Sequence, residues 1–190
     1  MQHQASRRLA LAALTATPLA LALAGCTPSA PALTAAQQLA AYRQLAGMTV
    51  GSPDAPDKAV VFFDTQCPHC ATLWDQFTPL IAVARVHWVP VRILGPASMD
   101  QAVALLEHPR PMSAFEDHKT RLRRREPSSL VPSSGRAKAL QAQVQESTDA
   151  LVASGAKSVP TVFYLDAQGS LQRFSGAVPT SELRERLNLR

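Results

Sequence analysis

Residues 59–70 of the chain read AVVFFDTQCPHC, and this stretch decides the fold. Its first half is a short, continuous run of apolar β-forming residues, which is typical of a strand buried on both faces in a parallel or mixed sheet. Pro68 suits the first turn of a helix, and helical spacing of apolar residues continues over 71–84, with a kink expected at Pro79. The stretch therefore predicts a buried strand that leads directly into a helix, with Cys67 and Cys70 at the junction.

Cys67 and Cys70 admit four interpretations. Attachment of a c-type haem requires a histidine directly after the second cysteine, where this chain has Ala71. Structural zinc requires four ligands, but there is no second cysteine pair and the other histidines are scattered along the sequence. A purely structural disulfide would close a very short loop and stabilise the protein little. The sequence therefore favours a redox pair and predicts no metal site and no cofactor.

The redox interpretation gives each residue of the motif a role. Free N–H groups and the positive end of the dipole at a helix amino end favour a thiolate, so Cys67 is expected to react with the substrate. Cys70, one turn further on and more buried, is expected to resolve the mixed disulfide. His69 can donate a hydrogen bond to the Cys67 sulfur or place positive charge beside it, which would make the disulfide a stronger oxidant. The alternative for His69 is an exposed loop residue with no role.

A proline also enters the third expected strand, in the sequence Ser158-Val159-Pro160-Thr161. Proline cannot donate to a strand ladder, so its presence there requires an explanation. A cis Val159–Pro160 bond beside the cysteines would supply one and would leave the Val159 backbone free to pair with a substrate strand.

The remainder of the chain alternates strands and helices. A strand is expected over 86–94, with Pro90 at an edge or a bulge, and three helices over 98–107, 113–125 and 136–154. Strands over 159–165 and 170–175 and a helix capped by Thr180 follow. This order predicts an α/β domain with a mixed central sheet over 58–190, carrying a helical insertion over 98–155 between the second and third strands.

The amino-terminal segment has the pattern of an export signal. Arg7 and Arg8 precede an apolar stretch that ends in Leu-Ala-Gly-Cys at Cys26, so residues 1–25 are expected to be a lipoprotein-type signal peptide. The tetrapeptide resembles the bacterial lipobox, which implies lipidation of Cys26; the alternative is an ordinary signal with an incidental cysteine. Residues 26–57 are expected to be a tether, with a possible short helix over 35–45.

The charge balance argues against nucleic acid as a partner. The formal net charge of +5 falls by two, to +3, if Arg7 and Arg8 leave with the signal. The dense basic cluster over 121–125 is expected to be a solvated helix end rather than a site for an acidic partner or a membrane surface.

Together these motifs resemble the thioredoxin superfamily, and in particular the periplasmic thiol:disulfide interchange proteins of the DsbG and DsbC type. FFDTQCPHC over 62–70, Trp74, and the segment 159–183 carry the resemblance, which extends over residues 58–190. It implies a thioredoxin-like fold with Cys67 as nucleophile, Cys70 as resolving cysteine and Pro160 as the cis-proline. Asp64 matches an acidic position of the family, and two roles are equally open for it: a polar group behind the cysteines or a cap of the strand end.

Two features depart from that type. Cys-Pro-His-Cys together with valine before the cis-proline is the pairing of the DsbA oxidases, and the segment between Cys26 and Lys58 is shorter than the dimerisation domain of DsbC and DsbG. We therefore expect a monomeric, periplasmic, lipid-anchored oxidoreductase, more at the outer than the inner membrane. It would exchange disulfides with protein thiols, with oxidation favoured, and use a membrane redox partner. The alternatives are a reductase or isomerase kept reduced by such a partner, and a copper-binding chaperone on the same fold.

Overall fold

The structure is a computed structural model that describes residues 32–132 and 137–189. Within these residues, no helix combines the length and the apolar character needed to cross a membrane. The expected signal segment over 1–25 and the lipidation site at Cys26 lie outside the described residues.

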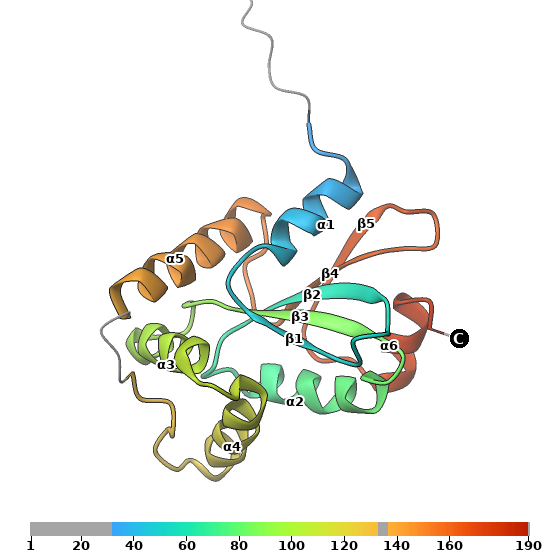
Figure 1. Cartoon of the computed structure of the whole chain (residues 1–190). Helices are drawn as coiled ribbons and strands as arrows, with labels where there is room; N and C mark the ends of the chain where they lie inside the picture. The colour runs from blue at the N-terminus through green and yellow to red at the C-terminus, as the bar shows by residue number, and fades with distance from the viewer. Residues whose placement is uncertain (1–31, 133–136, 190) are drawn as a thin grey trace, which may run out of the picture. The chain divides into compact units, whose positions relative to one another are not determined.

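Five strands form one mixed sheet in the order β1-β3-β2-β4-β5 (Figure 1). The central strand β2 (Asp57–Phe63) pairs parallel with β3 (Arg85–Pro90) and antiparallel with β4 (Thr161–Leu165). At the two edges, β1 (Met48–Val50) pairs antiparallel with β3, and β5 (Leu171–Ser175) pairs antiparallel with β4. The predicted mixed sheet is confirmed.

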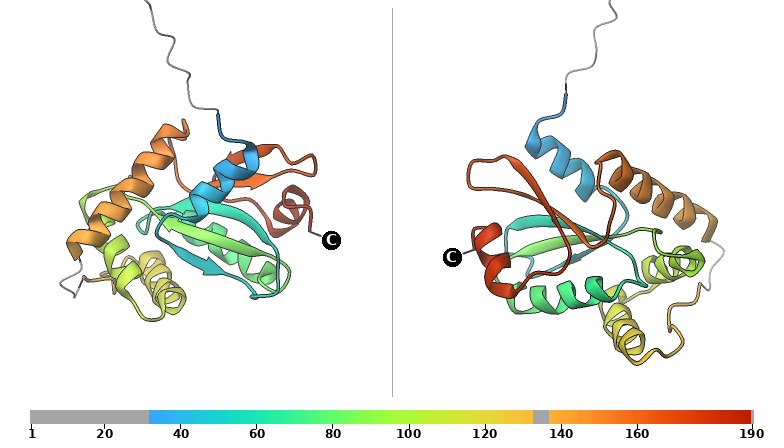
Figure 2. Two further views of the ribbon diagram at one scale, coloured as in Figure 1. Left: turned by 45° about the horizontal axis from the view of Figure 1, so that its top comes forward. Right: turned by 180° about the vertical axis from the view of Figure 1, so that it is seen from behind.

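Helices cover both faces of this sheet and give three layers (Figures 1 and 2). One face carries α1 (Ala35–Arg43) and α5 (Ala137–Ala153). The other carries α2 (Pro68–Phe77), the 3-10 turn η1 (Thr78–Leu80) and α6 (Thr180–Arg186). The remaining two helices, α3 (Pro96–Glu107) and α4 (Pro111–Arg124), form the helical insertion together with α5 and pack beside one end of α2.

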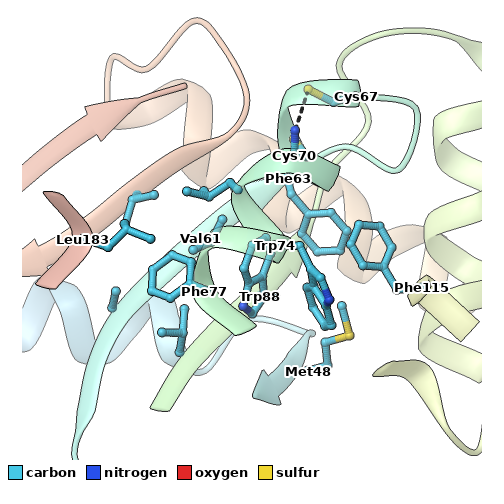
Figure 3. Packing of buried hydrophobic residues seen from close by; sticks show 14 of the residues in the cluster. Met48, Val61, Phe63, Cys67, Cys70, Trp74, Phe77, Trp88, Phe115 and Leu183 are labelled. Atoms are coloured by element: carbon cyan, nitrogen blue, oxygen red, sulfur yellow. Dashed lines mark hydrogen bonds between the residues drawn. The ribbon is translucent and has the colours of Figure 1, made fainter. Parts of the chain in front are cut away.

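Strand β2 belongs to both core layers because successive side chains of a strand point to opposite faces. Val61 and Phe63 join the cluster beneath α2 and α6, where Trp88 and Phe77 pack against them (Figure 3). Val60 and Phe62 join the cluster beneath α1. Residues 60–63 are fully buried, so the expectation of a strand covered on both faces is confirmed.

The possible short helix over 35–45 is present as α1, but the expectation that residues up to 57 form a tether is wrong for the described part. The compact unit begins at Leu33, and α1 packs on the sheet through Leu39 and Tyr42, with Tyr42 in edge contact with Phe62. Strand β1 extends the sheet by pairing Met48 with Trp88. The sequence did not predict β1 because three residues with one polar member are too short for a periodic signal. The domain thus starts well before the expected boundary at residue 58.

Three further expectations need correction. Helix α2 ends at Phe77 instead of continuing to residue 84, because Pro79 lacks the N–H that would extend the α-helical ladder. Pro90 lies on an inner strand without a bulge beside it, at the strand end beyond the last residue that β1 pairs. Thr180 does not cap α6, which begins after Pro179; its hydroxyl instead donates to the Gln76 carbonyl at 2.9 Å.

Candidate active site

The cysteine pair lies where β2 passes into α2. The chain leaves β2 at Phe63, crosses a loop of three residues and reaches Cys67, which is the N-cap of α2 with extended backbone angles. The Cys67 sulfur accepts a hydrogen bond from the Cys70 N–H at 3.3 Å, drawn as the dashed line in Figure 3. Pro68 occupies the first turn, where its missing N–H costs no helix hydrogen bond. Both cysteines are free thiols.

The two thiols have opposite ionisation behaviour. A hydrogen bond from the Cys70 side chain lowers the pKa of Cys67, and the N–H groups of Cys70 and His69 add to this against the effect of burial, from an ordinary value of 9.0 to about 6. Burial raises the pKa of Cys70 far above its usual range, and its hydrogen bond to Cys67 raises it further. Cys67 is therefore largely a thiolate near neutral pH, while Cys70 remains protonated and can donate to it.

His69 acts on Cys67 less directly than expected. Its side chain is exposed, and among the described residues its ring makes no hydrogen bond to the Cys67 sulfur. The pKa of Cys67 is lowered mainly by the Cys70 side chain, then by the N–H groups of Cys70 and His69, and least by the charge of the His69 ring. The expected hydrogen bond from the ring to the Cys67 sulfur is therefore absent, and the ring lowers the pKa of Cys67 only through its charge.

The segment at Val159 faces the cysteine pair, as the sequence predicted. The Val159–Pro160 peptide bond is cis, and the Cys67 sulfur lies 3.5 Å from the Val159 carbonyl oxygen, which accepts from it when Cys67 is in its protonated thiol form. Strand β4 begins only at Thr161, so the Val159 N–H lies outside the ladder and has no partner within the described parts of the chain. Such a free N–H beside a reactive sulfur can pair with the backbone of an extended peptide.

Asp64 proves to be an anchor for the loop that precedes the cysteines. The side chain is completely buried and accepts four hydrogen bonds, of 2.8–2.9 Å, from the N–H groups of Gln66, Ile93 and Leu94 and from the Ser98 hydroxyl. It therefore ties the end of β2 to the chain that leaves β3 and to the start of α3. Of the two roles left open, capping of the strand end is the one that the geometry supports.

An ion-pair cluster joins α2 to α4 and was not predicted. The nearly buried Lys119 binds Asp75 and lies 2.6 Å from Glu116, whose carboxylate also accepts from the Trp74 indole N–H. Arg123 binds Asp75 as well. Burial would raise the pKa of Asp75, but the hydrogen bonds from Lys119 and Arg123 outweigh it and lower that pKa. No sequence signal indicated this cluster, because its partners lie about forty residues apart.

The basic segment over 121–125 is only partly a solvated helix end. Arg124 and Arg125 are exposed, and Arg121 pairs with Asp117 on its own helix. Arg123 is also exposed, but it donates to the carbonyl of Ala71 in the first turns of α2. The segment therefore holds α4 against the helix that carries the cysteines.

The described histidines outside the motif, His87, His108 and His118, belong to separate parts of the fold. His87 lies 2.9 Å from the Leu45 carbonyl, the His108 ring accepts from a neighbouring N–H, and His118 lies against the Thr65 carbonyl. Across residues 32–132 and 137–189, no group of three histidine, cysteine or carboxylate side chains is placed to hold a metal ion.

Comparisons with known proteins agree with this geometry. The sequence model of the thioredoxin-like domain matches residues 48–189. The thiol:disulfide interchange protein DsbG of Pseudomonas aeruginosa is 30% identical over 149 residues, which cover 77% of this chain and 57% of that protein. The chain thus spans somewhat more than half the length of this relative.

Solved structures share the fold at lower identity. The catalytic domain of Proteus mirabilis ScsC superposes with a TM-score of 0.60 and 19% identity, covering 82% of this chain and 97% of that domain. The thiol-disulfide exchange protein alpha-DsbA2 of Wolbachia pipientis superposes with a TM-score of 0.60 and 16% identity, covering 81% of this chain and 94% of that chain. The family match, the relative and the cysteine pair at the start of α2 agree, and the chain belongs to the thioredoxin-like domain family.

Proposed function

We propose that the protein is a thiol:disulfide oxidoreductase that exchanges disulfides with protein thiols through Cys67 and Cys70, and that it acts mainly as an oxidase. The observation that carries this proposal is the asymmetry of the two thiols. Cys67 has a pKa lowered to about 6 by the hydrogen bond from Cys70, whereas burial raises the pKa of Cys70. One sulfur is thus a good leaving group at neutral pH, and the other is held protonated beside it.

In the oxidising direction, a substrate thiolate attacks the Cys67 sulfur of the Cys67–Cys70 disulfide. A new bond forms between the substrate sulfur and Cys67, the bond to Cys70 breaks, and Cys70 leaves with the electron pair and takes up a proton. A second substrate thiolate then attacks the substrate sulfur of the mixed disulfide and releases Cys67 as a thiolate. The substrate dithiol loses two electrons, which the enzyme gains.

The direction follows from the stability of the reduced enzyme. Every contact that favours the Cys67 thiolate stabilises the dithiol form relative to the disulfide, and a more stable reduced form makes the oxidised form a stronger oxidant. The Cys67 sulfur accepts an N–H at 3.3 Å and a hydrogen bond from the Cys70 thiol. These contacts favour oxidation of substrates over reduction.

The proposed partners follow from the surroundings of Cys67. The free Val159 N–H suits an extended, reduced segment of a protein substrate, which would add one strand segment beside β4. Pro160 would hold Val159 in this position, Pro68 would set the first turn of α2, and His69 would add charge at its exposed end. After each turnover a membrane redox partner would accept the two electrons and restore the disulfide.

For localisation we propose a monomer in the periplasm, tethered through lipid on Cys26, with the outer membrane favoured over the inner. Cell fractionation tests this: wild-type protein should sediment with membranes, and the Cys26→Ser variant should not. Equal release of both proteins into the soluble fraction would contradict the anchor and leave the redox proposal untouched.

The reduction potential of the Cys67–Cys70 pair, measured at equilibrium with glutathione, tests the redox proposal. We expect a value shifted toward the roughly −120 mV of a strong thiol oxidant and clearly less negative than the about −270 mV of thioredoxin. A value near the latter would overturn the oxidase direction in favour of a reductase or isomerase. Failure to oxidise a reduced protein substrate, together with tight uptake of Cu(I), would overturn the enzyme and favour the copper chaperone.

A further inference from the structure

His118 is a buried histidine that reaches from the helical insertion to the loop before Cys67. It lies on α4 with only 2% of its surface exposed. Its Nε2 is 2.9 Å from the Thr65 carbonyl oxygen, and its Nδ1 is 3.0 Å from the Ser128 hydroxyl. A carbonyl oxygen can only accept, so Nε2 carries the proton and donates; the Ser128 hydroxyl can donate or accept, so in the neutral ring Nδ1 accepts from it. The contacts therefore define one neutral tautomer.

The environment of the ring keeps it neutral. Burial lowers the pKa of His118, against the hydrogen bond to Thr65 and the charge of Asp117, the neighbouring residue on α4. Charge on the ring is thus not what this histidine supplies near neutral pH. What it supplies is a directed N–H donor inside the protein.

The acceptor of that hydrogen bond is two residues before the reactive cysteine. Thr65 is 1% exposed, and within the described parts of the chain its carbonyl has no partner other than His118. Two side-chain contacts from α3 hold the same loop: Thr65 donates to Gln101 at 2.9 Å, and Gln66 donates to Ser98 at 2.7 Å. The helical insertion therefore contacts this loop from both α3 and α4, and among these contacts His118 is the one that binds a backbone carbonyl, that of Thr65.

We propose that His118 is a positioning residue for thiol exchange, whose Nε2–H fixes the Thr65 carbonyl and so sets where the Cys67 sulfur lies relative to Val159 and the Cys70 N–H. The physical reason is that a buried carbonyl without a donor is costly, so its peptide plane would rotate to find one. Rotation of that peptide would change the backbone angles of Gln66 and move the helix start. This inference rests on the proposed function.

The test uses two substitutions that differ in reach. In His118→Gln the terminal amide nitrogen overlies the position of Nε2 and can still donate to Thr65. In His118→Asn the shorter amide overlies Nδ1, so it can bond Ser128 but cannot reach Thr65. Both variants are neutral and polar and both leave space where the ring stood, which makes each the control for the other.

His87 offers a matched control elsewhere in the fold. Its Nε2 likewise contacts a backbone carbonyl, that of Leu45, at 2.9 Å, and its Nδ1 contacts the Thr49 hydroxyl at 3.0 Å. Of the partners of His87, Leu45 lies in the segment that joins α1 to β1 and Thr49 lies in β1, both away from the cysteine loop. The pair His87→Gln and His87→Asn therefore reproduces the chemical change without touching the Thr65 carbonyl.

The readouts are the pKa of Cys67, from its thiolate absorbance, and the rate constant for reaction of reduced protein with a small aromatic disulfide. We expect His118→Gln to stay within about twofold of wild type and His118→Asn to react about tenfold more slowly, because small misplacements of reacting groups are costly. The His87 pair should match wild type in both readouts, whatever its effect on unfolding.

Equal reactivity of the Gln and Asn variants at position 118 would overturn the proposal and leave His118 a purely structural residue. If neither variant folds, nitrogen NMR of the wild-type imidazole decides: a ring whose only proton is on Nδ1 at neutral pH would contradict the donor role. A wild-type Cys67 with an ordinary thiol pKa and no exchange activity would instead refute the proposed function, which separates the two failures.

Discussion

The hydrogen bond from Cys70 to Cys67 can be removed or replaced by a single substitution. In Cys70→Ala the donor is lost, whereas in Cys70→Ser a hydroxyl remains where the thiol stood. The Cys70 side chain is the largest cause of the low pKa of Cys67, and it is completely buried, so water cannot take its place. We expect the alanine variant to raise the pKa of Cys67 and the serine variant to leave it close to wild type.

The size of the effect follows from the type of hydrogen bond. A hydrogen bond to a charged group contributes about 1.5–3 kcal/mol, and a thiol is a weak donor, so the lower end applies. Each pKa unit corresponds to about 1.4 kcal/mol, so the pKa of Cys67 should rise by about 1 in Cys70→Ala. At pH 6 the thiolate fraction would then fall from about a half to about a tenth.

The assay is a titration of thiolate absorbance in the ultraviolet. The protein carries Cys26→Ser as background, so that Cys67 and Cys70 are its only thiols. The doubly substituted Cys67→Ser, Cys70→Ala protein supplies the baseline, and the rate of alkylation across the same pH range gives a second measure. An unchanged Cys67 pKa in Cys70→Ala would refute the reasoning and assign the low pKa to the backbone N–H groups of the helix start.

Three other predictions concern stability. Between pH 6 and 8, the unfolding free energy of reduced wild-type protein should rise by about 2 kcal/mol relative to that of Cys67→Ser. The reason is that in this pH range the unfolded thiol binds more protons than the native thiol, whose pKa is lowered to about 6. Urea titrations measure this, and equal pH profiles of the two proteins would contradict it. Trp88→Ala should cost about 3–5 kcal/mol in the same titrations, since the indole is fully buried against other aromatic rings, and a loss below about 1 kcal/mol would mean that the core repacks. Lys119→Met should lower the unfolding free energy by only about 1–2 kcal/mol, because the side chains of its partners Asp75 and Glu116 are 38% and 47% exposed and stay hydrated. High salt should reduce the difference in unfolding free energy between wild type and variant, and no salt dependence would argue against an ionic contribution.

The parts of this protein that were predictable from its sequence are local ones. A run of apolar β formers defines β2, and proline in the first helical turn places Cys67 at the amino end of α2. Each signal depends on residues within one turn or one strand of each other, so no knowledge of long-range packing is required.

The expectations that failed depended on which element packs against which. Residues 33–50 contain many alanines and offer only a short apolar pattern, yet α1 and β1 gain stability from the sheet that they contact. Arg123 resembles a solvated helix end, but Asp75 lies across from it on α2. In each case a weak local pattern was overridden by contacts that only the folded chain provides.

The sequence by itself determined that two cysteines stand at a strand-to-helix junction and that a proline opens a later strand, because spacing and proline geometry are local properties. Tertiary structure decided how the pKa values of the two cysteines differ and which segment lies against them. It buries Cys70 so that its proton stays in place to stabilise the Cys67 thiolate, and it brings Val159 to the Cys67 sulfur across ninety-two positions of sequence. It also places the His118 N–H against the Thr65 carbonyl. Burial and long-range contact depend on how whole elements pack, and so the ionisation of the site is a property of the fold rather than of the motif.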